Sequence, residues 1–354
     1  QYIHVLGAMV NDANAAVTQL PLLSLTRQQE MFDLFNRDAQ SLPSFLPHFS
    51  MWWQRQCYSA PQGVAVVAAE GRMSFAELDT LANQIARYLQ SQEIGAGDRI
   101  GLMLPRDPIL LATVLAIFKV GAAWVPMHAH WSQDYQQAVL DDAGVSCVLH
   151  DSERLPWQGS QRALDFSISA TPWHALSGDG VEDADDPAAL ACIIYPAQPA
   201  AKPRGVSVSH RNLSALVAWG VRLFDSRSPV RAALTQDLGA DSALFEVFVT
   251  LCSGGALVLI DDLLSLQARE RPTSSAAKLL SVVNHITVTP TLAGEMLRNQ
   301  WLPKGLRSVV LVGEPAPQAL RESLLAHPGV KDVWVMQACP ENCGINFVAH
   351  FGEH

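Results

Sequence analysis

The segment "YPAQPAAKPRGVSVSH" (195–210) has the surroundings of a phosphate-binding turn but lacks the residues such a turn uses. The apolar run "ALACII" precedes it and "RNLSALVAWGVRLF" follows, which predicts the order strand, loop, helix. Phosphates are held in such turns by backbone N–H groups and by hydroxyls, in loops rich in Gly, Ser and Thr. Residues 196–201 contain none of these three types. Lys202 and Arg204 remain as groups that could hold a phosphate by charge.

A second group of reactive side chains lies near the end of the sequence. Cys339, Cys343, His350 and His354 have a superficial likeness to a zinc finger, but six residues separate Cys343 from His350. That spacing is too short for the usual finger. We interpret these residues as buried thiols and a frayed chain end. The sequence has no Gly-x-Ser-x-Gly elbow, which argues against a hydrolase of that class.

Composition and charge exclude several classes of partner. The chain has 354 residues, a net charge of −10 and 49% apolar residues, which is typical of a globular protein with two or three domains. The negative charge and the lack of Lys/Arg clusters argue against a nucleic acid. The longest apolar run, "ILLATVLAIF", is too short to span a membrane. Six scattered cysteines favour a reducing, cytoplasmic location.

Residues 1–45 differ from the rest of the sequence. Their pattern predicts a helix end, an extended stretch "LPLLSLT", a short helix and a linker bounded by proline. Their apolar periodicity is too weak for a core of their own. The sequence begins without an initiator Met, and "QYIHVLGAMV" looks like the inside of a longer chain. We expect residues 1–45 to be a tail and linker, and residues 46–354 to form one α/β unit.

The 46–354 region begins with a hairpin and an amphipathic helix. "GVAVVAAEGRMS" predicts a hairpin that turns at Glu70-Gly71. "SFAELDTLANQIARYLQ" predicts a helix that begins with a capping box formed by Ser74 and Glu77. Apolar residues three and four apart give this helix one buried stripe, which consists of Phe75, Leu78, Leu81, Ile85 and Leu89.

Strand and helix patterns then alternate to the end of the chain. The expected strands are "RIGLML", "AAWVPM", "SCVLH", "LACIIY", "ALVLI", "HITVTP", "SVVLVGE" and "VWVMQA". This alternation predicts an α/β fold of mostly parallel sheets covered by helices. Ligands in such folds bind beyond the carboxyl ends of the strands. A site is therefore expected in the segments that follow strands, which are 195–206, 237–246, 287–291, 312–316 and 337–346.

Several segments, in order, resemble motifs of the adenylation domains of nonribosomal peptide synthetases, members of the AMP-forming acyl- and amino-acid ligase superfamily. "MSFAELDTLANQIARYL" and "GDRIGLMLPRDPILLATVLAIFKVGAAWVPM" resemble the family's early motifs. "LACIIYPAQPAAKPRGVSVSHRNL" lies on the phosphate-loop motif, Y-T-S-G-S-T-G-x-P-K-G-V. "DSALFEVFVTLCSGGALVL", "LRSVVLVGEP" and "VWVMQACPENCGINFVAH" lie on the substrate-aspartate, G-G-E and Y-G-P-T-E motifs. The resemblance covers residues 46–354.

The resemblance implies the large N-terminal subdomain of an adenylate-forming enzyme, incomplete at its C-terminal end. The family's hinge and its small C-terminal subdomain, which carries the catalytic lysine, have no counterpart here, so no catalytic residue is assigned. The first 45 residues are similar to the tail of a condensation domain and its linker ("LPLLSLTRQQEMFDLFN"). The implied partners are condensation and carrier-protein domains of the same megasynthase.

The family reaction joins an amino-acid carboxylate to the α-phosphate of ATP with Mg²⁺, and passes the aminoacyl group to a carrier-protein phosphopantetheine. The resemblance implies that Asp241 pairs with the substrate ammonium, whereas the residues alone also fit a surface or helix-cap carboxylate. The implied amino-acid pocket consists of Asp241, Ser242, Phe245, Thr287, Val310, Val312, Gln337, Ile345 and Asn346. The implied nucleotide contacts, at degenerate motifs, are Tyr195, Lys202, Arg204, Gly205, Gly313, Glu314 and Pro340.

The groups that touch ATP in that family are replaced here. The loop T-S-G-S-T-G becomes Pro196-Ala197-Gln198-Pro199-Ala200-Ala201, in which two prolines remove backbone donors. Arg204 stands in place of the motif's lysine. Ala338 replaces an aromatic that stacks on adenine, and Asn342 replaces the glutamate at the magnesium position, where a neutral amide is a poor ligand. His128 replaces the aspartate of V-P-L-D.

Three functions stay open from the sequence. The first is an adenylation-domain fragment whose amino-acid activation is impaired or lost. The second is a structural spacer or docking module inside a megasynthase. The third is a binding module that still holds an amino acid through Asp241.

Overall fold

The computed structural model describes residues 2–14, 16–17, 20–35, 46–182, 184, 186–195, 202–223, 229–234, 236–240, 242–260, 274–339 and 344–352. The chain divides into two compact units, Gln1–Phe45 and Leu46–His354. The first unit contains helices α1 (Tyr2–Asn11) and α2 (Leu25–Phe35), and α1 buries none of its residues. Its helices therefore contribute little core of their own.

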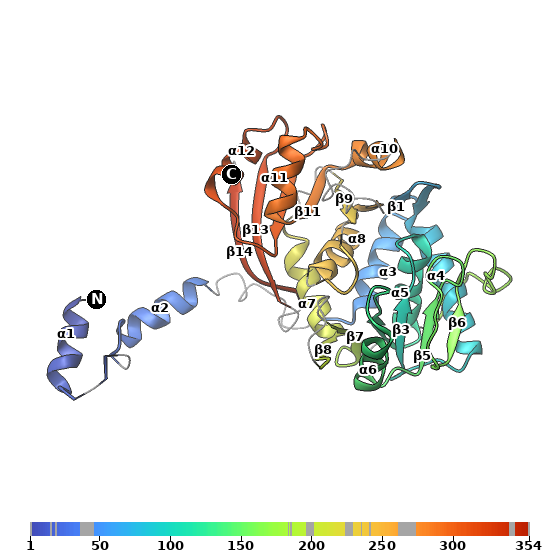
Figure 1. The fold of residues 1–354 in the computed structure, drawn as a ribbon, viewed down its shortest axis with the longest axis horizontal. Helices are drawn as coiled ribbons and strands as arrows, with labels where there is room; N and C mark the ends of the chain where they lie inside the picture. The colour runs from blue at the N-terminus through green and yellow to red at the C-terminus, as the bar shows by residue number, and fades with distance from the viewer. Residues whose placement is uncertain are drawn as a thin grey trace. The chain divides into compact units, whose positions relative to one another are not determined.

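Two sheets form the framework of the second unit (Figure 1). The eight-stranded sheet has the order β14-β13-β12-β11-β9-β10-β1-β2. Its strands are β1 (Val64–Ala68), β2 (Gly71–Ser74), β9 (Arg231–Leu234), β10 (Ala256–Leu259), β11 (His285–Val288), β12 (Ser308–Val312), β13 (Asp332–Cys339) and β14 (Gly344–Gly352). The six-stranded sheet has the order β6-β5-β3-β4-β7-β8. Its strands are β3 (Arg99–Met103), β4 (Ala123–Pro126), β5 (Cys147–His150), β6 (Ala163–Asp165), β7 (Leu190–Ile194) and β8 (Val206–Ser209).

Most neighbouring strands are parallel, as the alternation of strand and helix predicts. Antiparallel pairs occur at β1 with β2, β13 with β14, and β7 with β8. In each case one member of the pair lies at the edge of its sheet. Within each sheet the inner strands therefore run in the same direction, so their carboxyl ends lie at one edge. Ligands bind at that edge in open α/β sheets.

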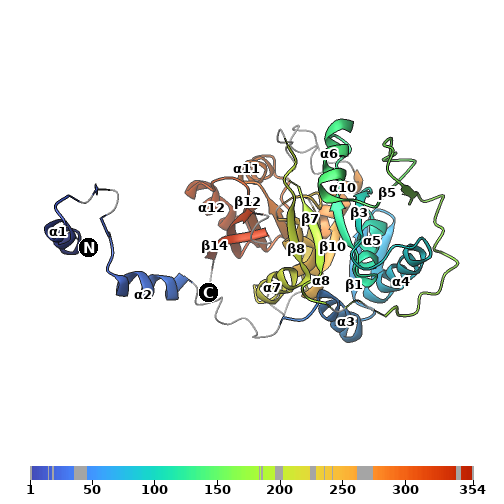
Figure 2. The same cartoon turned by 90° about the horizontal axis from the view of Figure 1, so that it is seen from below.

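Helices fill the space between the sheets and cover their outer faces (Figure 2). One core cluster joins both sheets through α3 (Phe49–Ser59), α4 (Phe75–Ser91), α5 (Pro108–Lys119), α7 (His210–Gly220), the π-helical segment η3 (Phe245–Val249) and α8 (Thr250–Cys252). A second cluster packs the other face of the eight-stranded sheet against α10 (Ser274–Val282), α11 (Pro290–Arg298) and α12 (Gln318–Leu325). A third packs the six-stranded sheet against α6 (Gln133–Ala143).

The start of α4 shows how local sequence sets an element. Ser74 and Glu77 form the expected capping box: the Ser74 backbone N–H donates to Glu77 Oε2 at 2.7 Å, and the Glu77 N–H donates to Ser74 Oγ at 3.2 Å. These bonds satisfy donors that a helix N-terminus leaves unpaired. The predicted apolar stripe then packs into the core, with Phe75, Leu78 and Ile85 fully buried.

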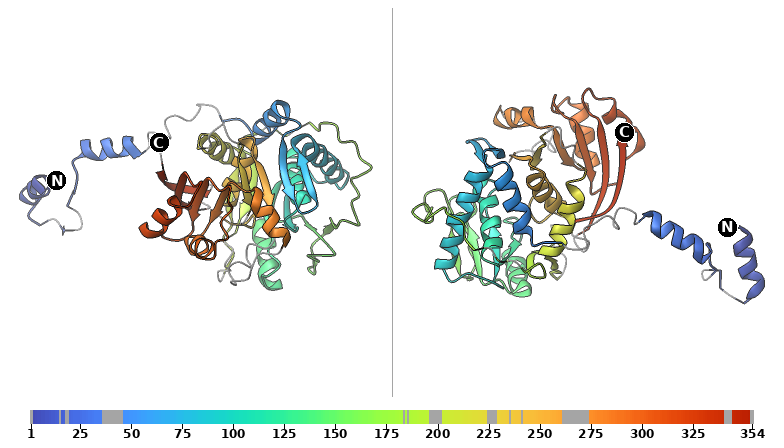
Figure 3. Two further views of the ribbon diagram at one scale, coloured as in Figure 1. Left: turned by 90° about the horizontal axis from the view of Figure 1, so that it is seen from above. Right: turned by 180° about the vertical axis from the view of Figure 1, so that it is seen from behind.

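Two segments differ from the prediction. The order around the phosphate-loop motif is strand, loop, strand, helix, because Val206–Ser209 forms β8 and pairs antiparallel with β7 before α7 begins. The segment interpreted as a frayed end is instead β14, which pairs with β13 from Asp332↔Gly352 to Cys339↔Gly344 (Figure 3). Val348 packs on one face of that sheet and Phe351 on the other, and this alternation is what stabilises a strand there.

Among the described residues, no helix is long and apolar enough to cross a membrane.

Candidate functional site

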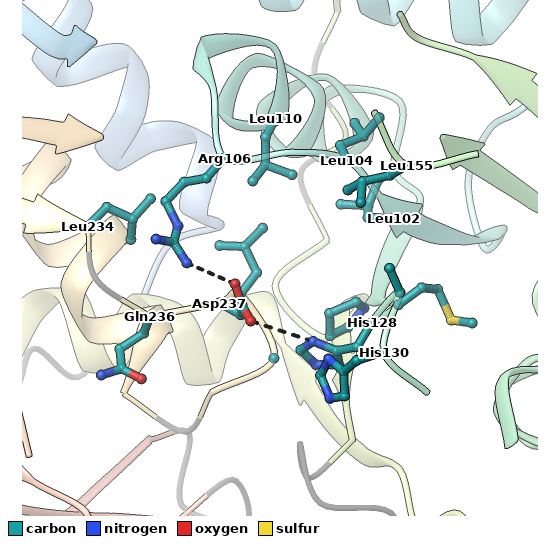
Figure 4. Close-up of a pocket in the computed structure, with 15 residues that line it drawn as sticks. Leu102, Leu104, Arg106, Leu110, His128, His130, Leu155, Leu234, Gln236 and Asp237 are labelled. Carbon is teal, nitrogen blue, oxygen red and sulfur yellow. Dashed lines mark hydrogen bonds and ion pairs between the residues drawn. The ribbon is translucent and has the colours of Figure 1, made fainter. Parts of the chain in front are cut away.

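A cavity of about 320 Å³ lies at the carboxyl ends of β3, β4 and β9, where the two sheets approach each other (Figure 4). Arg106 follows β3, His128 follows β4, and Asp237 follows β9. Most of the wall is apolar and includes Leu102, Leu104, Leu110, Leu155, Leu234 and Leu238. A mostly apolar cavity with a few convergent polar groups is the usual form of a small-molecule site.

Arg106 connects the two sheets across this cavity. Its Nη2 donates to Asp237 Oδ1 at 2.8 Å, and its Nη1 donates to the backbone oxygen of Ile260 at 3.0 Å. The Arg106 side chain is only 12% exposed, whereas that of Asp237 is 57% exposed. The Arg106 guanidinium is therefore held in the wall of the cavity, and the Asp237 carboxylate lies at its solvent-exposed rim.

His128 lies on the other side of Asp237. Its Nδ1 is 3.7 Å from Asp237 Oδ2, and its backbone oxygen accepts a hydrogen bond from Gln136 Nε2 at 3.0 Å. Burial lowers the pKa of His128, the Asp237 carboxylate opposes that shift, and neighbouring His130 adds to it. The imidazole is therefore neutral at pH 7 and contributes no charge to the cavity. Gly239 lies against the ring, where a Cβ would come within 2.6 Å of Nε2.

This polar group was not predicted as a site. Sequence reasoning noted His128 only as a departure from a motif, and Arg106 carried no signal of its own. Asp237 lies in one of the strand-following segments where a site was expected. The signal that could have found all three is that each follows the end of a strand that pairs with parallel neighbours, which is where ligands bind in such sheets.

The structure brings together several residues of the predicted amino-acid pocket. Thr287 of β11 pairs in register with Val310 of β12, so the two side chains lie on the same face of the sheet. Val310, Val312 and Phe245 are buried in one core cluster. Ser242 is also buried, and its backbone oxygen accepts the N–H of Glu246, one turn further on. Asp241 lies outside the described residues.

Gln337 does not join this wall. Met336, one residue earlier, is the β13 residue that packs with Val310 and Val312, and it pairs in register with Val312. Side chains alternate along a strand, so Gln337 is directed to the other face, and it is exposed. Ile345 pairs with Ala338, and Asn346 lies at a register shift in the pairing of β13 with β14. The side chains of Ile345 and Asn346 lie outside the described part of the chain.

Tyr195 and Gly205 flank the loop 196–201 and contact each other. The Tyr195 hydroxyl donates a 2.6 Å hydrogen bond to Asp142 Oδ2, and its ring is fully buried. Burial and the Asp142 carboxylate raise the pKa of Tyr195, so the hydroxyl stays protonated. Lys202 and Arg204 are both exposed. The loop residues themselves lie outside the described residues, so the structure places only their flanks.

The predicted contacts after β12 have local partners. Gly313 has a φ of +84°, a left-handed conformation that favours glycine. Glu314 accepts hydrogen bonds from the Thr291 hydroxyl at 2.6 Å and from its backbone N–H at 3.1 Å, at the start of α11. Pro340 and Asn342 lie outside the described residues. Within the described ranges, no group of three or more His, Cys, Asp or Glu residues is placed to hold a metal ion.

This architecture is that of the large N-terminal subdomain of adenylate-forming enzymes. The NpsA N-terminal subdomain of Klebsiella oxytoca, solved in complex with 3-hydroxybenzoyl-AMSN, has a TM-score of 0.73 at 20% identity and covers 87% of this chain and 76% of its own. The AMPPNP-bound nonribosomal peptide synthetase FmoA3 has a TM-score of 0.77 at 22% identity, covering 98% of this chain and 37% of its own. The AMP-binding enzyme family matches residues 53–350, and the chain belongs to that family.

The curated relatives of this chain include subunits of the linear gramicidin synthase and the AMB antimetabolite synthetase. One component of the linear gramicidin synthase of Brevibacillus parabrevis is 26% identical over 337 residues, which is 94% of this chain and 6% of that synthase component. AmbB of Pseudomonas aeruginosa is 28% identical over 334 residues, 90% of this chain and 25% of its own. The chain thus spans a small part of the relatives it matches. These similarities confirm the resemblance to an adenylation domain.

Proposed function

We propose that this chain derives from an amino-acid-activating adenylation domain and that its ATP-dependent activity is impaired or lost. The observation that carries the proposal is the contrast between the loop 196–201 and its flanks. The flanking strands β7 and β8 pair with each other, while the loop between them has no glycine, serine or threonine. A polyanion with Mg²⁺ needs many donors in such a loop.

The flanks of the loop are held by contacts of their own. β7 and β8 pair antiparallel from Leu190↔Ser209 to Ile194↔Val206, so the strands that precede and follow the segment 195–205 lie side by side. Ser209 then caps α7: its Oγ accepts the Asn212 N–H, and the Asn212 side chain accepts the Ser209 N–H. These contacts do not involve the loop residues. A substitution inside the loop can therefore remove phosphate donors without unfolding the domain.

The donors that remain suit a nucleotide poorly. Lys202 and Arg204 carry charge but are exposed, and surface charges are screened by salt. Glu314 is already engaged by Thr291. At the position where the family holds Mg²⁺, Asn342 offers a neutral amide. We therefore derive no chemical step through ATP or Mg²⁺ in this chain.

The residues of the predicted amino-acid pocket depart less from the family pattern than the nucleotide-binding residues do. Phe245, Val310 and Val312 pack together, with Thr287 on the same face, in the positions that the family resemblance assigns to the pocket wall. Asp241 would supply the carboxylate for the substrate ammonium. This contrast favours an adenylation domain that retains a substrate wall and has lost its nucleotide contacts.

The second candidate function is a structural spacer or docking module within a megasynthase. It would use the same fold to position condensation and carrier-protein domains, the partners that the family resemblance implies, without chemistry. The two candidates differ in ligand binding: a degenerate enzyme can retain affinity for an aminoacyl-adenylate, whereas a spacer need not bind it.

The test is calorimetric titration of Mg·ATP, and then of a non-hydrolysable aminoacyl-adenylate analogue, into the purified chain. We expect no measurable binding of Mg·ATP and no ATP–pyrophosphate exchange above a control without protein. Analogue binding at micromolar strength, about 8 kcal/mol, would support the degenerate enzyme, and its absence from a folded chain would support the spacer. Exchange above the control would contradict the loss of activity.

A further inference from the structure

We propose that the cavity between Arg106, Asp237 and the surrounding leucines binds a small zwitterion, a free amino acid with an apolar side chain. Among the described residues, none that lines this cavity belongs to the predicted pocket wall around Phe245 and Val310. The proposal therefore adds a second amino-acid site to this chain, and it does not depend on ATP.

The charges of the cavity match the two ends of an amino acid. A guanidinium binds a carboxylate in a planar, bidentate arrangement, and a carboxylate binds an ammonium. Arg106 and Asp237 are 2.8 Å apart, so a ligand that carries both charges on one carbon could contact both without moving the Arg106 stem. Arg106 also donates a hydrogen bond to the Ile260 backbone oxygen, which orients the guanidinium independently of Asp237.

Charge balance favours the zwitterion over a simple acid or amine. A carboxylate alone would compete with Asp237 for one guanidinium and leave an excess negative charge at the rim. An amine alone would leave an excess positive charge beside the buried Arg106. Within the described part of the chain, His128 is the second titratable group within 4 Å of Asp237, and because it is neutral it offsets neither excess. A zwitterion brings a carboxylate to Arg106 and an ammonium to Asp237, and it leaves the net charge of the cavity unchanged.

The rest of the cavity sets the side chain of the ligand. Leu102, Leu104 and Leu110 come from the β3–α5 segment, and Leu155, Leu234 and Leu238 complete the apolar lining (Figure 4). When these leucines bury an aliphatic side chain of the ligand, the binding free energy gains about 25 cal/mol for each Å² of apolar surface removed from water. A charged or strongly polar side chain placed against these leucines would lack a partner, because the polar lining residues are His128, His130, Gln236 and the pair Arg106 and Asp237.

The experiment titrates three probes into the intact chain without nucleotide: L-leucine, leucinamide, which lacks the carboxylate, and 4-methylpentanoate, which lacks the ammonium. We expect L-leucine to bind at least about tenfold more tightly than either analogue, because each analogue leaves one buried or rim charge without its partner. No detectable binding of L-leucine, or equal binding of all three probes, would overturn the proposal. Since this series uses one protein, unfolding of a variant cannot obscure it.

Variants then assign the site. We expect Asp237→Asn, and separately Leu155→Trp, which fills the cavity without touching the ion pair, to weaken L-leucine binding at least about tenfold. Asp241→Asn, in the predicted pocket, should leave the affinity within about twofold. Loss of binding in Asp241→Asn with retention in Asp237→Asn would move the ligand to the predicted pocket and overturn the inference. A thermal melt of each variant confirms folding, and nucleotide binding, which tests the proposed function, is measured separately.

Discussion

Gly205 lies so close to Tyr195 that a Cβ at position 205 would come within 2.7 Å of the tyrosine hydroxyl oxygen. The same Cβ would lie 2.6 Å from Ile193 Cγ2. Gly205 is one of the few phosphate-motif residues that this chain retains, and the structure supplies a reason that involves no phosphate. Packing between the residue that precedes β8 and the end of β7 requires a residue without a side chain there.

Substitution of Gly205 by alanine is expected to destabilise the domain by about 1–3 kcal/mol, because a buried tyrosine ring must move. The measurement is the midpoint of urea unfolding, followed by circular dichroism. Gly95→Ala is the matched control, since nothing lies within 4 Å of the Cβ it would add. Its effect should stay within about 0.5 kcal/mol. Equal midpoints for the two variants would contradict the packing argument.

The stability of the domain is expected to fall between pH 7 and pH 5 because two histidines are buried in neutral form. Burial, together with a smaller effect of the neighbouring His48, whose ring centroid is 3.7 Å away, lowers the pKa of His210 to about 3. Burial lowers the pKa of His285 to about 4. Both histidines take up protons near pH 6.5 when unfolded, so acid favours the unfolded state.

Below pH 6.5 the free energy of unfolding is expected to fall by about 1.4 kcal/mol per pH unit for each of the two histidines. Urea unfolding at pH 7, 6 and 5 measures it. His210→Phe removes one of the two histidines and should reduce the dependence of the unfolding free energy on pH by the contribution of that histidine. The variant should still fold, since phenylalanine can pack with Phe118 as the imidazole does. Exposed His174→Gln is the control and should leave the slope unchanged. An unchanged slope in His210→Phe would contradict the prediction.

A polar group around Asp79 offers a third prediction. Its carboxylate accepts hydrogen bonds from Trp53 Nε1 at 2.7 Å and Asn83 Nδ2 at 3.1 Å, and it lies 3.0 Å from Nζ of the buried Lys119. Asp79→Leu removes the charge that offsets a buried ammonium and is expected to cost about 3 kcal/mol. The double substitution with Lys119→Met should recover more than half of that loss, because an apolar pair needs no charge partner. Additive losses in urea unfolding would argue against coupling between the two residues.

The fourth prediction concerns the loop itself. Replacing residues 196–201 by Thr-Ser-Gly-Ser-Thr-Gly restores backbone donors, hydroxyls and the freedom to turn tightly. We expect this variant to bind Mg·ATP measurably by calorimetry while the unaltered chain does not. A control variant with six alanines in the same positions separates the removal of the two prolines from the return of the hydroxyls. If the alanine control binds as well as the restored loop, hydroxyl loss is not the cause.

Local sequence predicted the elements whose determinants are close together in the chain. The capping box of α4 spans four residues, and the hairpin of β1 and β2 forms where it was expected, although it turns at Ala69-Glu70, one residue before the predicted Glu70-Gly71. β8 was missed because a strand of four residues, Val206–Ser209, followed at once by a helix gives too short a pattern to distinguish from a loop. β14 was predicted as a frayed chain end, because its stability as a strand depends on pairing with β13, which the local sequence does not specify.

The site was harder to predict than the fold for a physical reason. Arg106 and Asp237 are separated by 131 positions and come from different sheets, so no local period or spacing relates them. Thr287 and Val310 could be assigned to one wall only through the resemblance to a family. The alternation that excludes Gln337 from that wall depends on the register of β13 with β12, which a sequence alone does not set.

The order of the eight-stranded sheet has a consequence for synthesis of the chain. β1 pairs with β10, and Val66 lies opposite Leu257. About 190 further residues must therefore be translated before the hairpin of β1 and β2 can pair with β10. At ribosomal rates that delay is roughly 10 to 40 s, long compared with the formation of a hairpin. The six-stranded sheet ends at Ser209 and can be completed before β10 emerges. The nascent chain therefore carries an unpaired hairpin edge beside a finished sheet, and that edge is where aggregation during translation would begin.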